Sequence, residues 1–209
     1  MVYITRAMEA IFTRMSREFS VVLLTGPRQV GKTTMLKKLA TAENIKREYV
    51  SLDDITEREM AKNDPKLFLQ LHKPPVFIDE VQYAPELFPY IKIYVDEHQQ
   101  PGDFWLTGSQ IFKLMDGVQE SLAGRVCLLH MSPLSQAEAC GVQSEPFIVD
   151  VAGLLARSKT RQAADIQEVF RRIWCGGMPA LVSGAMLENF VVSEIVKSYQ
   201  NAGLEPFIY

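Results

Sequence analysis

A short stretch near the amino terminus, residues 26–34, combines the residue types that bind a nucleotide phosphate. It fits the pattern G-x-x-x-x-G-K-[ST] without a mismatch. Its two glycines can take backbone angles that other residues avoid, so the loop can curve around a phosphate and point amide N–H groups at it. Lys32 offers a positive charge to the β- and γ-phosphates, and Thr33 offers a hydroxyl to Mg²⁺. The predicted phosphate-binding residues are Gly26, Pro27, Arg28, Gln29, Val30, Gly31, Lys32, Thr33 and Thr34.

Two acids, Asp79 and Glu80, follow an apolar run at residues 76–78. Phosphate-loop enzymes need a carboxylate near the metal, and Asp79 suits that position, so Thr33 and Asp79 are the predicted metal ligands. A second acid beside the ligand can orient and polarise the water that attacks the γ-phosphate, which makes Glu80 the predicted catalytic carboxylate. The alternative is a solvated acidic pair at a strand end, but the phosphate loop favours the functional interpretation.

Further polar residues are candidates with competing interpretations. Thr107 and Ser109 follow the apolar residues 104–106, where a hydroxyl could bond the attacking water or the γ-phosphate; the alternative is turn chemistry. Arg125 ends a predicted helix, where it either balances the helix dipole or neutralises the transferred phosphoryl group in its own or a neighbouring subunit. Arg28 either contacts phosphate or points to solvent.

The elements that must position these residues alternate between strands and helices. Apolar runs predict strands at residues 21–24, 76–80, 104–109 and 126–129, and alternation predicts a half-buried strand at residues 48–54. Helical spacing predicts helices at residues 1–18, 35–40, 55–72 with a break at Pro65, 87–98 and 111–122. This alternation predicts an α/β fold of the phosphate-loop type, a parallel five-stranded sheet with helices on both faces and its polar residues at the carboxyl ends of the strands.

Beyond about residue 145 the pattern changes to a small helical C-terminal region. Capping-box spacing predicts a short helix that begins at Ser135, and helical spacing predicts helices at residues 149–156, 166–174 and 186–201. We therefore predict an ATPase domain at residues 1–145 and a helical tail at residues 146–209.

The composition is that of an ordinary globular chain, with 209 residues, 47% of them hydrophobic, and a net charge of −3. No apolar run approaches the roughly 18 residues of a membrane span and the start lacks a signal-peptide core, so we expect a cytoplasmic protein without a membrane partner. The basic residues between 157 and 172 are interpreted as a solvated helical face rather than a nucleic-acid patch. Cysteines and histidines are scattered, which argues against a disulfide framework, a zinc site or a histidine base. They are Cys127, Cys140, Cys175, His72, His98 and His130.

Motifs at four places in the chain resemble, in order, those of a family of prokaryotic AAA-type ATPases. They are residues 24–34, 77–87, 106–110 and 122–126. The resemblance covers roughly residues 1–140, with Arg6 also matching, and implies that residues 26–33 are a Walker A loop and Asp79 and Glu80 a Walker B pair. It implies a sensor at Thr107 or Ser109 and a functional Arg125. It also implies that the sensor strand lies between the phosphate-loop strand and the Walker B strand.

Full-length members of that family continue through a winged-helix-like region into a domain resembling restriction endonucleases. Residues 176–181 resemble the end of the ATPase region and residues 187–209 the opening of the nuclease-like domain, which implies an internal deletion and a truncation in this sequence. We expect no nuclease activity, because Glu188, Glu194 and Glu205 are too few and too helical to build the metal site alone.

The leading functional prediction is an ATP-binding protein that hydrolyses ATP with Mg²⁺ through the Walker motifs and couples hydrolysis to a conformational change. The alternative is a nucleotide-binding switch or degenerate remnant that binds ATP with little hydrolysis. A small-molecule kinase is disfavoured because Glu80 suits activated water, and a GTPase because no N-K-x-D motif occurs. ATP, ADP and Mg²⁺ are the expected ligands; a weak homo-oligomer stays open, and the sequence indicates no particular nucleic-acid or protein partner.

Overall fold

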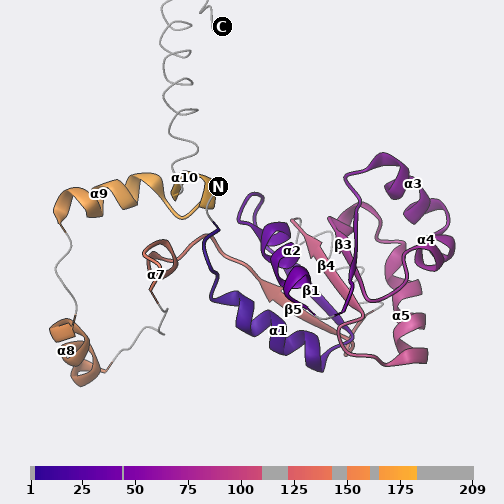
Figure 1. The fold of residues 1–209 in the computed structure, drawn as a ribbon, viewed down its shortest axis with the longest axis horizontal. Helices are drawn as coiled ribbons and strands as arrows, with labels where there is room; N and C mark the ends of the chain where they lie inside the picture. The colour runs from indigo at the N-terminus through magenta and orange to yellow at the C-terminus, as the bar shows by residue number, and fades with distance from the viewer. Residues whose placement is uncertain (1–2, 44, 110–121, 143–149, 161–164, 183–209) are drawn as a thin grey trace, which may run out of the picture. The chain divides into compact units, whose positions relative to one another are not determined.

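The computed structural model describes residues 3–43, 45–109, 122–142, 150–160 and 165–182. The chain forms two compact units (Figure 1). One, the sheet unit, is Arg6–Pro133; the other, the helical unit, combines Met1–Thr5 with Leu134–Tyr209. The domain boundary predicted near residue 145 stays a prediction.

The sheet unit contains a five-stranded parallel sheet in the order β2-β3-β4-β1-β5. The strands are β1 Val21–Thr25, β2 Glu48–Ser51, β3 Val76–Asp79, β4 Phe104–Gly108 and β5 Val126–His130. The predicted α/β fold is therefore confirmed. The predicted position of the sensor strand is confirmed as well, because β4 lies between β1 and β3.

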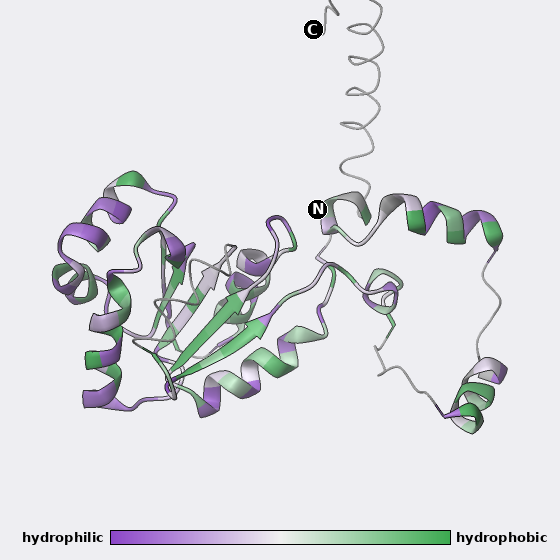
Figure 2. Ribbon diagram, turned by 180° about the vertical axis from the view of Figure 1, so that it is seen from behind, coloured by the Kyte–Doolittle hydropathy of each residue, from purple (hydrophilic) through white to green (hydrophobic). Residues whose placement is uncertain are grey.

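The strands β1, β3 and β4 are buried on both faces of the sheet, whereas β2 and β5, at its two edges, are more exposed. All five residues of β1 and of β4 are buried. Figure 2 shows some strands of the sheet in continuous green, the colour of hydrophobic residues, and others in paler colours. On one face, Leu23 and Ile78 pack in a core with Phe88 of a covering helix. On the other face, the ring of Phe12 meets the ring of Trp105 edge-on, with centroids 4.9 Å apart. Both faces are covered by helices, as the continuous apolar strands predicted.

Most helices of the sheet unit lie close to the predicted bounds, but α1 begins at Met8 rather than at residue 1, and η1 was not predicted. They are α1 Met8–Glu18, α2 Lys32–Ala42, α3 Ile55–Asn63, α4 Pro65–Leu71, the short 3-10 helix η1 Val81–Tyr83, and α5 Leu87–His98. The predicted break at Pro65 is confirmed: Asp64 accepts a hydrogen bond from the amide of Leu67, and Pro65 opens α4. The strand predicted over 48–54 ends at Ser51, because Asp54 instead caps α3 through the amides of Thr56 and Glu57.

The helical unit contains α7 Gln136–Ala139, α8 Val151–Thr160, α9 Ile166–Cys175 and α10 Pro179–Val182. The predicted capping box is confirmed, with the hydroxyl of Ser135 and the carboxylate of Glu138 exchanging hydrogen bonds with each other's backbone amides. The helices predicted at 111–122 and 186–201, and the acids Glu188, Glu194 and Glu205, lie wholly or almost wholly outside the described residues. Among the residues that are described, no helix combines the length and apolarity needed to cross a bilayer.

Candidate functional site

The predicted phosphate loop connects β1 to α2 at the carboxyl edge of the sheet. Its backbone takes positive φ angles at Gly26 (144°), Gln29 (64°) and Gly31 (95°). A Cβ atom at Gly26 would lie 2.3 Å from the carbonyl oxygen of Met131, closer than any side chain permits. Glycine is therefore required at Gly26 by both the backbone angle and the space.

Gly26→Ala is expected to lower the free energy of unfolding by about 1–3 kcal/mol, because it adds both backbone strain and overpacking. The matched control is Gly124→Ala, since Gly124 also has a positive φ (76°) but has open space where its Cβ would lie. Urea unfolding followed by tryptophan fluorescence compares the two variants. Equal losses would mean that the approach of the Met131 carbonyl does not constrain the loop.

Lys32, at the start of α2, is buried beneath the loop. Its ammonium donates hydrogen bonds to the carbonyl oxygens of Gly26 at 2.9 Å and Pro27 at 2.8 Å. Burial lowers the pKa of Lys32 from its ordinary value, while the negative charges of Glu80 and Asp79 oppose that shift. A phosphate at this loop would favour the charged ammonium further, so the site is suited to an anion.

Arg6 joins the phosphate loop to the chain that leaves β5. Its guanidinium donates to the carbonyl oxygen of Val30 at 2.7 Å and to that of Ser132 at 2.7 Å, and the side chain is buried. One planar guanidinium thus holds a backbone carbonyl of the phosphate loop and a backbone carbonyl of the segment after β5. Arg6 is also one of the residues that carry the family resemblance, and these contacts give it a structural role beside the phosphate loop.

Asp79, the last residue of β3, collects hydrogen bonds from three hydroxyl groups. The hydroxyl of Thr33 lies 3.0 Å from both carboxylate oxygens, the hydroxyl of Tyr49 lies 3.1 Å from Oδ2, and the hydroxyl of Thr107 bonds Oδ1. Asp79 is only 5% exposed, and a buried carboxylate needs such donors. The charge of Asp79 is therefore fixed beside the first turn of α2.

Glu80 has a left-handed backbone, with φ 58° and ψ 46°. Its amide donates to the hydroxyl of Thr107 at 3.1 Å, and its carboxylate oxygen Oε2 accepts from the hydroxyl of Ser109 at 3.2 Å and from the side-chain amide of Gln82. Hydrogen bonds thus hold both the backbone amide and the carboxylate of Glu80. A non-glycine residue in the left-handed region has a strained backbone, and such strain is common at functional sites.

The structure brings most of the predicted site residues together at the carboxyl edge of the sheet. Thr33, Asp79, Glu80, Thr107 and Ser109 form one connected hydrogen-bonded group. Thr107 is fully buried, and its hydroxyl already bonds Asp79 and the amide of Glu80. Ser109 is only half-buried, so of the two sensor candidates it is the one that a ligand can reach.

The two predicted arginines are not part of this group. Arg28 is exposed, and its guanidinium lies 3.4 Å from the hydroxyl of Tyr83. Arg125 immediately precedes β5 and pairs through two nitrogens with the carboxylate of Asp96 on α5. Because β5 runs parallel to β1, Arg125 lies at the amino edge of the sheet, one strand length of about 16 Å from the loop edge.

Sequence reasoning missed Tyr49 and Gln82 as members of the site. Tyr49 lies on β2, and reaches Asp79 because β2 and β3 are neighbours in the sheet. Gln82 follows Glu80 by two residues on η1, so its proximity was the signal that could have found it.

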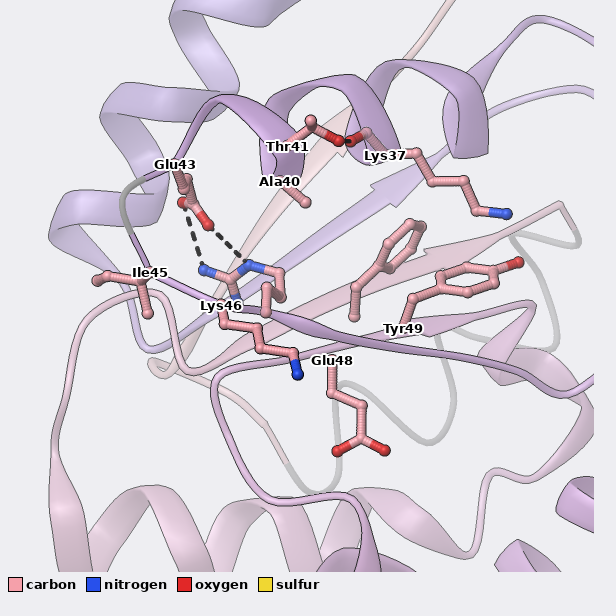
Figure 3. Close-up of a pocket in the computed structure, with 10 residues that line it drawn as sticks. Lys37, Ala40, Thr41, Glu43, Ile45, Lys46, Glu48 and Tyr49 are labelled. Atoms are coloured by element: carbon pink, nitrogen blue, oxygen red, sulfur yellow. Dashed lines mark hydrogen bonds and ion pairs between the residues drawn. The ribbon is translucent and has the colours of Figure 1, made fainter.

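An open pocket of about 600 Å³ lies between the end of α2 and β2, beside the site rather than in it (Figure 3). Lys37 stacks on the ring of Tyr49, with its ammonium 3.7 Å from the ring centroid, while Glu43 and Arg47 form an ion pair across the wall. Tyr49 lines the pocket with its ring and donates a hydrogen bond to Asp79 through its hydroxyl. The ring of Tyr49 therefore lies between the pocket and the carboxylate of Asp79.

The oxygen atoms of Thr33 and Asp79 fit a Mg²⁺ ion. Magnesium takes hard oxygen ligands in an octahedron with bonds of 2.0–2.1 Å, in which adjacent ligands lie about 2.9 Å apart. The hydroxyl oxygen of Thr33 lies 3.0 Å from each carboxylate oxygen of Asp79, so the hydroxyl and one of these oxygens could be adjacent ligands. Within the described ranges, no group of at least three His, Cys, Asp or Glu side chains could hold a metal, so water and phosphate would complete the shell.

Comparison with known proteins gives a family match over most of the sheet unit. The sequence profile described as an AAA domain matches residues 18–140. An uncharacterized protein of Mycobacterium tuberculosis and one of Mycobacterium bovis are each 39% identical to this chain over 115 residues. That region is 55% of this chain but 25% of each mycobacterial protein, so the chain matches about a quarter of the length of these relatives.

Solved structures share the fold at low sequence identity. A Walker-type ATPase of Pyrococcus abyssi superposes with a TM-score of 0.54 at 16% identity, over 96% of this chain and 77% of that one. A DNA replication initiation factor superposes with a TM-score of 0.51 at 11% identity, over 91% of this chain and 58% of the other. The likeness shows that the sheet and its helices follow the P-loop ATPase fold.

Proposed function

This chain belongs to the AAA domain family, and from that premise we propose that it binds ATP and hydrolyses it with Mg²⁺. The observation that carries the proposal is the connected group at the loop edge of the sheet, where Thr33, Asp79 and Glu80 meet beside the ammonium of Lys32. A loop of this kind binds phosphate without acidic help, so the two acids indicate metal-assisted chemistry on that phosphate.

The proposed roles follow from the contacts of each side chain. The loop amides and Lys32 bind the β- and γ-phosphates, and Thr33 and Asp79 hold the metal. When bound, Mg²⁺ would neutralise charge on the phosphate oxygens. Thr107 keeps Asp79 and Glu80 in place, while Ser109, the more accessible hydroxyl, is proposed to sense the γ-phosphate or the attacking water.

The reaction needs only ATP and one water. The water oxygen bonds the γ-phosphorus while the bond from that phosphorus to the bridging oxygen breaks, leaving ADP with the electron pair. The water proton passes to the carboxylate of Glu80 and then to the product phosphate. Glu80 is half-exposed, and among the described residues the hydrogen bonds to its carboxylate go to Oε2, so a water can reach Oε1.

Lys32→Ala is expected to weaken ATP binding by about 10–10²-fold, the effect of losing charge-assisted hydrogen bonds to phosphate. Calorimetric titration with ATP in Mg²⁺ measures the affinity, and a parallel hydrolysis assay with ATP and GTP tests turnover and base preference. Lys38→Ala, on an exposed part of the same helix, is the matched control. Unchanged affinity in Lys32→Ala would overturn the assignment of the phosphate loop.

The runner-up function is a nucleotide switch that binds ATP with little hydrolysis. One observation favours it: in a single copy, Arg125 lies at the far edge of the sheet and cannot assist the γ-phosphate. Tight ATP binding with turnover no faster than that of Glu80→Gln, at every protein concentration, would support the switch.

A further inference from the structure

We propose that Gln82 is a positioning residue that holds the carboxylate of Glu80 in the orientation needed for hydrolysis. The inference rests on the proposed ATPase function and adds to it a residue outside both Walker motifs. Gln82 lies on η1, the single turn that follows Glu80. Its side-chain nitrogen donates to Oε2 of Glu80 and lies 3.4 Å from the hydroxyl of Ser109.

The orientation of the Gln82 amide is set by chemistry. An ionised carboxylate only accepts hydrogen bonds, so the NH₂ end of the amide must face Glu80 and the carbonyl must point elsewhere. That carbonyl oxygen is buried and has no hydrogen-bond partner among the residues that the structure describes. Gln82 as a whole is only 7% exposed.

A buried carbonyl without a partner lowers stability by about 1–3 kcal/mol, and native proteins contain few such groups. An apolar side chain of similar length would avoid this loss. Gln82 therefore serves a purpose other than stability, and its contacts to Glu80 and Ser109 connect it to the site.

Two donors, Gln82 and Ser109, converge on the same oxygen of Glu80. The backbone of Glu80 is fixed separately, because its amide bonds Thr107. With Oε2 engaged, the carboxylate cannot rotate freely, and Oε1 is left as the oxygen that can accept a water proton. Since an error of about 1 Å in such a group can reduce a rate by about 10²-fold, holding this carboxylate affects turnover directly.

The test is Gln82→Met, which keeps the length of the side chain and removes its hydrogen bonds. The matched control is Gln70→Met on the exposed side of α4. We expect Gln82→Met to reduce turnover by about 10–10²-fold while leaving the dissociation constant of ATP within about twofold of the parent value. We also expect the nucleotide-free variant to unfold at the same or a higher urea concentration, because the unpaired carbonyl is gone.

A second readout does not depend on turnover. ADP with aluminium fluoride mimics the phosphoryl group under attack by water, so its affinity reports the placement of Glu80. We expect Gln82→Met to weaken the binding of ADP with aluminium fluoride by about tenfold relative to the binding of ATP. In the Glu80→Gln background the same substitution should have no further effect on either measurement, because Gln82 acts through Glu80.

The outcomes separate this inference from the proposed function. If the parent protein binds neither ATP nor the analogue, the proposed function fails and the role of Gln82 fails with it. If the parent binds both and Gln82→Met retains parental turnover and analogue affinity, the role of Gln82 alone is overturned. Lower stability with equal losses of ATP and analogue affinity would show that Gln82 is a structural residue.

Discussion

Glu80→Gln is expected to retain ATP binding and to lose turnover by about 10²–10⁴-fold, the contribution of a general base. The amide side chain is nearly isosteric and can still accept from Ser109, so the hydrogen-bonded group should persist while the proton acceptor is lost. Single-turnover hydrolysis of ATP, alongside calorimetric binding, measures the two effects separately.

Asp79→Asn is the informative comparison for Glu80→Gln. Asp79 accepts from three hydroxyl groups and touches Thr33, so its substitution should weaken the dependence of ATP binding on Mg²⁺ rather than only the chemical step. If Glu80→Gln hydrolysed ATP at the parental rate, Glu80 would not be the general base. The kinase or switch interpretation would then replace the proposed ATPase mechanism.

The phosphate loop could be predicted because its determinants are local. Glycines at residues 26 and 31 and the lysine that follows them encode the backbone angles and the charge within a few residues, and the structure shows positive φ at both glycines. The sheet as a whole was predictable from the continuous apolar strands. The position of β4 between β1 and β3 came from the family resemblance, since the pattern of any one strand does not say which strand lies beside it. The places of β2 and β5 at the edges were not predicted.

The hydrogen bond between Tyr49 and Asp79 could not be predicted, because the sequence does not show that their strands are neighbours. Tyr49 is 30 positions from Asp79 in sequence, and its hydroxyl reaches the carboxylate only because β2 pairs with β3 in one particular register. The left-handed backbone of Glu80 has no local signal either, because non-glycine residues rarely adopt it. It is accompanied by long-range contacts instead: the amide of Glu80 donates to the hydroxyl of Thr107, and its carboxylate accepts from the hydroxyl of Ser109.

The location of Arg125 also depended on the register of the sheet. The sequence predicted that Arg125 lies between a helix and a strand, but it did not indicate which acid or phosphate Arg125 would contact. The parallel pairing of Val126 with Val21 puts Arg125 at the amino edge, where it binds Asp96. This distance favours a role in a neighbouring subunit over a role at its own phosphate loop.

Arg125→Ala is therefore expected to leave ATP affinity nearly unchanged and to reduce turnover by about 10³–10⁵-fold, the effect of an arginine that stabilises a transferred phosphoryl group. If Arg125 completes the site of another copy, the specific activity of the parent protein should rise with protein concentration and that of Arg125→Ala should not. Arg14→Ala, an exposed arginine on α1, is the matched control.

Mixing Arg125→Ala with Glu80→Gln gives the decisive measurement. In a mixed assembly, the first variant contributes an intact Glu80 and the second an intact Arg125, so some sites regain both groups and activity should exceed the sum of the separate proteins. The ion pair between Arg125 and Asp96 would have to open for this. We therefore expect the specific activity of Asp96→Asn to rise at a lower protein concentration than that of the parent protein. Activity that is independent of concentration, without recovery on mixing, would show that Arg125 only joins α5 to the start of β5.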